Sequence, residues 1–101
     1  MLRLTETQIA HIKRVFGQCF LPQDRLWLFG SRVKTDAKGG DIDLYVETHY
    51  TEASKVVDAK LRFLSQLQMA IGEQKIDMVI KYRDYDMPIY HIAQQEGIRL
   101  V

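Results

Sequence analysis

Two carboxylates stand close together at the start of an apolar segment of this chain. Asp41 and Asp43 open the run Asp-Ile-Asp-Leu-Tyr-Val. In a strand their side chains point to one face, while the alternating apolar residues point to the other. Carboxylates held about 5 Å apart repel each other by roughly 3 kcal/mol at an effective dielectric constant near 20. A cation between the two would offset this repulsion, so the pair indicates a cation site at the beginning of a strand.

The hydrophobic pattern predicts the elements that must position this pair. Strands are expected over 25–29, 41–47 and 75–81, and helices over 5–20, 51–72 and 87–96. Thr5 and Gln8 form a capping-box pattern at the first helix, and Thr51 is the expected N-cap of the second. The second helix is expected to bury a stripe of apolar residues at helical spacing: Ala53, Val57, Leu61, Leu64, Leu67 and Ile71. Residues 98–101 offer a short terminal strand.

The lengths of the connections predict how the strands pair. The segment between the first two strands is too short for a usual parallel crossover, so these strands should be antiparallel. The long helix between the second and third strands suits a parallel crossover. We therefore expect one domain over 1–101, an α/β (α+β) fold with a small mixed three-stranded sheet, order 1-2-3, flanked by helices. That order places five residues at one edge of the sheet: Gly30, Ser31, Asp41, Asp43 and Asp77.

Three carboxylates beside a glycine turn suit a hard cation and a phosphorylated ligand. Mg²⁺ commonly combines one or two protein carboxylates with substrate phosphates. Two such ions can stabilise both the attacking and the leaving oxygen of a phosphoryl displacement. Gly30 allows a phosphate to approach the backbone, and Ser31 with the N–H groups after it can point at a phosphate oxygen.

Rival assignments of the acidic segment fit the sequence less well. An EF-hand calcium loop is excluded, because Lys38 stands where a ligand should follow Asp36. The P-loop signature and the dinucleotide-binding glycine fingerprint are both absent. The alternative that stays open is a surface hairpin with solvated aspartates.

The overall composition is that of an ordinary globular domain, with 101 residues, 47% of them hydrophobic and 27% charged. The net charge of +1 predicts no direct nucleic-acid binding and no general attraction to membranes. The single cysteine, Cys19, cannot form an internal disulfide and lies on the apolar stripe of the first helix. With no long apolar run and no basic-then-apolar leader, the chain is expected to be cytoplasmic and free of membrane segments.

Gly30-Ser31 followed, after nine intervening residues, by Asp41-Ile42-Asp43 resembles a known signature. It is similar to the GS…DxD motif of the DNA polymerase β-like nucleotidyltransferase superfamily, and in particular to the minimal nucleotidyltransferases. The resemblance covers essentially the whole chain and implies the nucleotidyltransferase fold. It also implies that Asp41, Asp43 and Asp77 are the catalytic, metal-binding residues, holding two Mg²⁺ ions on the triphosphate of ATP, and that Asp77 helps to deprotonate the attacking hydroxyl.

The same resemblance implies that Gly30 and Ser31 hold the terminal phosphates, with Arg32 neutralising further phosphate charge. The expected reaction transfers AMP from ATP to a hydroxyl group and releases pyrophosphate. Minimal nucleotidyltransferases act as antitoxins of toxin–antitoxin modules, in which adenylylation (AMPylation) of a tyrosine silences a partner HEPN-domain ribonuclease. A HEPN-domain partner in a hetero-oligomer is therefore expected here. A homodimer that transfers AMP to a small molecule and an antitoxin that acts by binding alone are the alternatives.

Overall fold

The computed structural model describes residues 4–30 and 42–101. In chain order the elements are α1 (Glu6–Cys19), β1 (Arg25–Phe29), β2 (Ile42–Glu47), α2 (Ala53–Ile71), β3 (Ile76–Lys81), α3 (Pro88–Glu96) and β4 (Ile98–Arg99). Every helix and strand predicted from the sequence is therefore present, with ends that differ by one or two residues. Of the predicted site residues, Ser31, Arg32 and Asp41 lie outside the described residues.

The four strands form a mixed sheet in the order β3-β2-β1-β4. β1 and β2 are antiparallel and β2 and β3 are parallel, as the connection lengths predicted. The expectation of a three-stranded sheet was wrong, because β4 adds a fourth strand antiparallel to β1. A terminal strand was expected at 98–101, and the observed strand has two residues, Ile98 and Arg99; its pairing with β1 was not predicted.

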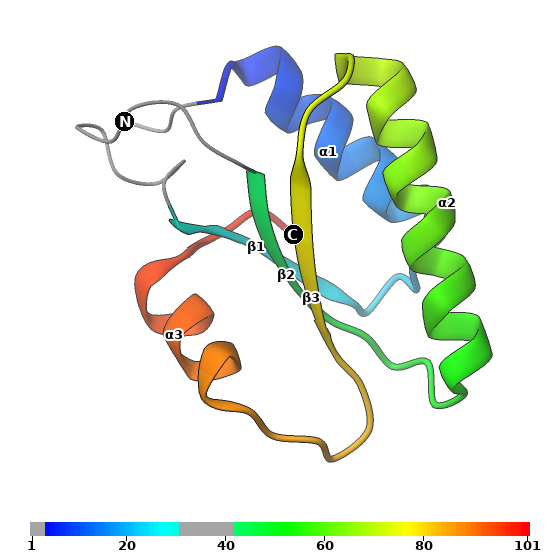
Figure 1. The fold of residues 1–101 in the computed structure, drawn as a ribbon, viewed down its shortest axis with the longest axis vertical. Helices are drawn as coiled ribbons and strands as arrows, with labels where there is room; N and C mark the ends of the chain where they lie inside the picture. Colours follow the sequence, from blue (N-terminus) through cyan, green and yellow to red (C-terminus); the bar gives the residue numbers. More distant parts are fainter. Residues whose placement is uncertain (1–3, 31–41) are drawn as a thin grey trace.

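Helices cover both faces of the sheet (Figure 1). α1 and α2 lie on one face, over a core that includes Leu26, Leu28, Ile42, Leu44, Val46 and Met78. α3 lies on the other face, where its Tyr90 and Ala93 pack with Trp27 and Tyr45 of the sheet. Successive residues of each strand point to opposite faces. Asp43 and Asp77 therefore share the α3 face with Tyr45 and Val79.

The apolar stripe expected for α2 was right at Leu64, Leu67 and Ile71, which pack on the core, and wrong at Ala53, Val57 and Leu61, which are exposed. Val57 is 55% exposed and Leu61 is 61% exposed, while the buried residues of the helix are Val56, Ala59, Phe63 and Leu67. The helix carries two neighbouring apolar rows, and the row that contains the largest side chain faces the core. Phe63 makes edge-on contacts with the rings of Phe16 and Phe20 on α1, and burying an aromatic ring stabilises more than burying a valine.

The N-terminal residues of two helices agree with the prediction from the sequence, and those of the third differ from it. The predicted capping box at α1 is confirmed, since Thr5 and Gln8 exchange side-chain-to-backbone hydrogen bonds. Pro88 occupies the first turn of α3, as expected. The N-cap of α2 is Glu52, which makes no capping hydrogen bond, and the predicted cap Thr51 precedes it. None of the helices in the described ranges is both long and apolar enough for a membrane span.

Candidate functional site

The strand register brings Asp43 and Asp77 side by side. They are direct partners on the parallel strands β2 and β3, and Phe29 is the partner of Asp43 on the antiparallel strand β1. Partners on adjacent strands lie about 4.8 Å apart and point to the same face. The end of β1 and the beginnings of β2 and β3 thus meet at one edge of the sheet. We call Gly30, Asp43 and Asp77 the carboxylate edge.

Gly30 lies directly against the carboxylate of Asp43. A Cβ atom on Gly30 would be 2.2 Å from Oδ2 of Asp43 and 3.0 Å from its Cγ. The backbone of Gly30 also has φ +76°, a left-handed conformation that residues with a Cβ rarely adopt. The sequence predicted that this glycine would give a phosphate access to the backbone. In the structure its missing side chain leaves room for the Asp43 carboxylate.

Backbone contacts hold the start of β2 against the start of β3. The Ile42 N–H donates to the Lys75 carbonyl at 3.0 Å, which extends the pairing of the two strands to this edge. The side chain of Gln68 on α2 accepts from the Gln74 N–H at 2.8 Å and donates to the Gln74 carbonyl. The turn that leads into β3 is therefore fixed to α2. Sequence reasoning missed this role, because Gln68 reads as one more polar residue of the helix.

The carboxylate edge offers hard oxygen donors to solvent. Asp43 is half-buried and Asp77 is exposed, and Asp77 has no hydrogen-bond or ion-pair partner in the part of the chain that the structure describes. Two like charges directly opposite each other destabilise a sheet, and a divalent cation between them removes that cost. Two aligned carboxylates suit Mg²⁺, which proteins usually bind through one or two carboxylates.

A complete metal centre is not present within the described ranges. No group of three or more histidine, cysteine, aspartate or glutamate side chains there is placed to hold a metal ion. The third predicted ligand, Asp41, lies outside those ranges, as do Ser31 and Arg32. The structure thus brings together Gly30 and two of the three predicted carboxylates.

Comparison with known proteins does not place this chain in a family. The sequence matches no protein-family model and no curated protein. The carboxylate edge and the motif that led to it are therefore the basis for assigning a function.

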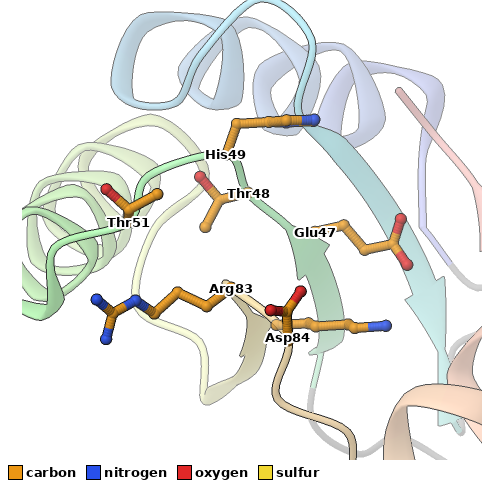
Figure 2. Close-up of a pocket in the computed structure, with 7 residues that line it drawn as sticks. Glu47, Thr48, His49, Thr51, Arg83 and Asp84 are labelled. Atoms are coloured by element: carbon orange, nitrogen blue, oxygen red, sulfur yellow. The ribbon is translucent and has the colours of Figure 1, made fainter.

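A cavity of about 340 Å³ lies at the opposite end of β2 and β3 (Figure 2). Both strands run toward it, since they are parallel. Seven residues line this cavity, which we call the carboxyl-end pocket: Glu47, Thr48, His49, Thr51, Lys81, Arg83 and Asp84. No motif in the sequence pointed to it, because the residues come from two connections that meet only in the folded chain.

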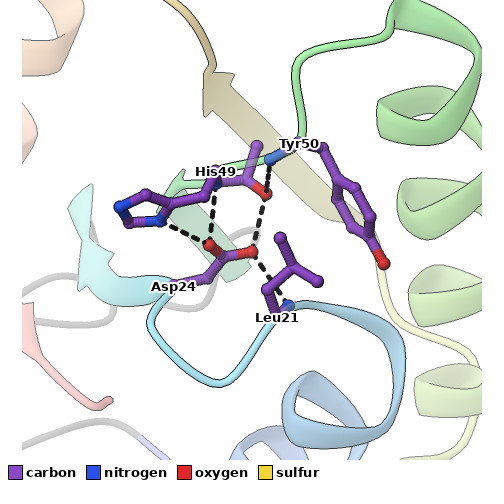
Figure 3. A network of polar contacts seen from close by, with 5 residues as sticks. Leu21, Asp24, His49 and Tyr50 are labelled. Carbon is purple, nitrogen blue, oxygen red and sulfur yellow. Dashed lines mark hydrogen bonds and ion pairs between the residues drawn. The ribbon is translucent and has the colours of Figure 1, made fainter.

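One wall of the carboxyl-end pocket is held by a buried carboxylate, Asp24 (Figure 3). Its Oδ2 accepts from the Leu21 N–H at 2.9 Å and from the Thr48 hydroxyl at 2.6 Å. Its Oδ1 accepts from the His49 N–H at 2.8 Å and lies 2.9 Å from His49 Nδ1. The side chain of Asp24 is fully buried, and protein donors occupy both oxygens. Asp24 therefore fastens the turn before β1 to the end of β2 and is not a free metal ligand.

Proposed function

We propose that this chain is a Mg²⁺-dependent nucleotidyltransferase with the nucleotidyltransferase fold, which transfers AMP from ATP to a hydroxyl group. One observation carries the proposal. Asp43 and Asp77 are in register on adjacent parallel strands, and the Asp43 carboxylate lies against the left-handed Gly30. Aligned acids suit Mg²⁺, which binds through one or two carboxylates together with substrate phosphates. A surface hairpin with solvated aspartates requires neither the register nor the contact.

The chain's own residues divide the work as follows. Asp43 and Asp77, with Asp41, would hold Mg²⁺, which neutralises charge on the triphosphate and on the leaving group. The acceptor hydroxyl oxygen forms a bond to the α-phosphorus of ATP, and the bond from that phosphorus to the bridging oxygen breaks. Pyrophosphate leaves, and the hydroxyl proton passes to Asp77, whose carboxylate is exposed and has no partner in the described chain. Ser31 and Arg32 complete the phosphate contacts.

The acceptor that best suits this site is a tyrosine of a HEPN-domain partner protein, with the chain acting as its antitoxin in the cytoplasm. The exposure of Asp77 at the edge of the sheet supports a macromolecular acceptor, because a hydroxyl on a protein surface can reach it without entering a closed cavity. Transfer to a small molecule would use a pocket near this edge, where a cavity of about 530 Å³ is lined by Gln68, Glu73, Gln74 and Lys75. Inhibition of the partner by binding alone would need no carboxylate pair.

Binding of ATP tests the site without any assumption about the acceptor. Isothermal titration calorimetry with Mg²⁺ and ATP should show a loss of affinity of at least about tenfold, equal to about 1.4 kcal/mol, for Asp43→Asn and for Asp77→Asn. Asp58→Asn is the matched control, because Asp58 is also exposed and makes only a 3.7 Å helix-surface ion pair with Arg62. Equal affinity in all four proteins would refute the nucleotide site.

Transfer is tested with the partner present. The chain, Mg²⁺, labelled ATP and the product of the neighbouring gene are incubated together, and the label is located by mass spectrometry. We expect AMP on a tyrosine of the partner with the wild-type chain and none with Asp43→Asn. If Asp43→Asn neutralises the partner as well as the wild type does and no label is transferred, the chain acts by binding and the enzymatic proposal fails.

A further inference from the structure

The carboxyl-end pocket has the position and the size of a small-molecule site. In open α/β sheets, ligands bind outside the carboxyl ends of the parallel strands, and the pocket occupies that place on β2 and β3. Its volume of about 340 Å³ falls within the range of ligand pockets. Glu47, which lines it, is about 13 Å along β2 from Asp43 at the usual rise per residue. The pocket is therefore separate from the carboxylate edge.

Arg83 is the residue of this pocket with an unusual backbone. Its φ is +59°, and no other residue except glycine has a positive φ in the ranges that the structure describes. A left-handed backbone is unfavourable for a residue with a Cβ, and such outliers concentrate at functional sites. The Arg83 guanidinium has five N–H donors and no hydrogen-bond or ion-pair partner in the described chain. In Figure 2 it extends toward the side of the pocket where Thr51 lies.

A second cation, Lys81, lines the pocket on the α3 face of the sheet. The ammonium of Lys81 lies 6.0 Å from the centre of the Tyr90 ring and makes no ion pair in the described chain. Of the acids in the pocket, Glu47 is already engaged, because its carboxylate accepts from the Tyr45 hydroxyl at 2.9 Å and from Gln94. Asp84 is the one carboxylate of the pocket without such a donor in the described chain. The pocket thus has more unused donors than unused acceptors.

The neutral side chains of the pocket are arranged by other contacts. Thr48 is committed, because its hydroxyl donates to Asp24 and accepts from the Tyr50 N–H. Thr51 is exposed, and its hydroxyl has no partner in the described chain, so it can donate to a ligand. The fork of Arg83 and this hydroxyl lie on the same side of the pocket (Figure 2) and together match a tetrahedral oxyanion with several acceptor oxygens.

We propose that the carboxyl-end pocket binds the phosphate group of a small phosphorylated ligand, with Arg83 as the bidentate anchor and Thr51 as a further donor. The left-handed backbone at Arg83 is maintained because it directs the guanidinium into the pocket. The Asp84 carboxylate repels an anion in the pocket and so lowers the affinity for phosphate. This site does not depend on nucleotidyl transfer at the other edge of the sheet.

The experiment titrates the whole chain with inorganic phosphate in EDTA, so that no metal ion bridges phosphate to the carboxylate edge. Backbone amide NMR signals of Thr51, Arg83 and Asp84 should shift together and saturate. Arg83→Gly should weaken phosphate binding at least tenfold while the melting temperature stays equal or rises, because glycine adopts a positive φ freely. Asp84→Asn should tighten binding several-fold. Arg62→Gln, which removes an exposed arginine from α2, should change nothing.

Two results would overturn the proposal. One is phosphate binding by Arg83→Gly that equals the wild type, which would show that the guanidinium does not hold the anion. The other is loss of binding in Asp43→Asn or Asp77→Asn, which would place the phosphate at the carboxylate edge. A failure of Mg²⁺–ATP binding with normal phosphate binding would count against the proposed function alone, so the two proposals are tested separately.

Discussion

Replacing Gly30 by alanine tests the geometry of the carboxylate edge. The new Cβ would meet Oδ2 of Asp43 at 2.2 Å, and Cβ atoms essentially never approach another atom within 3.0 Å. The carboxylate must therefore retreat by about 1 Å, which it can do because it is the end of a flexible side chain. The left-handed backbone of residue 30, at φ +76°, adds a cost of about 1–2 kcal/mol for any residue with a Cβ.

A matched control separates these two effects. Gly72 also has a left-handed backbone, with φ +85°, but a Cβ on it would have no atom within 4 Å. Both Gly30→Ala and Gly72→Ala should lower the melting temperature by about 4–16 °C, because about 1–2 kcal/mol corresponds to that shift in a domain of this size. Only Gly30→Ala displaces the Asp43 carboxylate. Misplacing a catalytic group by about 1 Å can cost on the order of 100-fold, so Mg²⁺–ATP affinity should fall at least about tenfold in that variant alone.

Calorimetric titration of ATP in the presence of Mg²⁺, with thermal unfolding of the same samples, gives both quantities. If Gly30→Ala binds Mg²⁺–ATP as well as Gly72→Ala does, the position of the Asp43 carboxylate does not determine nucleotide binding and the reasoning is refuted. A double-mutant cycle adds a second check. With Asp43→Ala already in place, Gly30→Ala should cause little further loss of nucleotide affinity, since contacting residues are not additive.

Three further changes probe the fold around the site. Gly17 is exposed on α1, and a Cβ added to it would have no atom within 4 Å. Gly17→Ala should therefore raise the free energy of unfolding by about 0.5–1 kcal/mol. An unchanged urea midpoint would contradict this prediction. Thr48→Val removes the 2.6 Å hydrogen bond to the buried Asp24. It should lower the free energy of unfolding in urea by about 1.5–3 kcal/mol. A decrease below about 0.5 kcal/mol, the size expected of a surface substitution, would show that this hydrogen-bond network does not stabilise the fold. Burial, with a smaller effect of Glu47, raises the pKa of the Tyr45 hydroxyl. The folded chain then keeps this proton where the unfolded chain loses it, so stability should fall as the pH rises past about 10, and Tyr45→Phe should flatten that fall between about pH 9 and 11.

Much of the sheet could be predicted from the sequence because strand pairing depends on quantities that a sequence contains. Alternation of side chains assigned the faces of β2, and the lengths of the connections assigned the directions of the strands. The register of β2 and β3 could not be predicted from the sequence. A shift by one residue would turn Asp77 to the opposite face, and only the structure shows that Asp77 is the partner of Asp43.

The features that were missed share a physical cause. The choice between two apolar rows on α2 depended on how Phe63 packs against α1, which is a contact between distant segments. The role of Asp24 depended on donors 24 and 25 residues away, at Thr48 and His49. The contact of Gly30 with Asp43 likewise joins the residue after β1 to a residue of β2. Local patterns determine local structure, whereas the partners of buried polar groups are set by the packing of the whole chain.

The parallel pairing of β2 and β3 gives the two ends of this strand pair opposite character. Their beginnings carry aligned aspartates, whereas β2 ends at Glu47 and β3 ends at Lys81 and leads to Arg83. An antiparallel pair would have placed the beginning of one strand beside the end of the other, so that Asp43 would have faced the basic end of β3. The aspartates at one end of the pair and the basic residues at the other are thus separated by about 13 Å. Substitutions at the two ends should therefore act additively on stability and independently on their ligands.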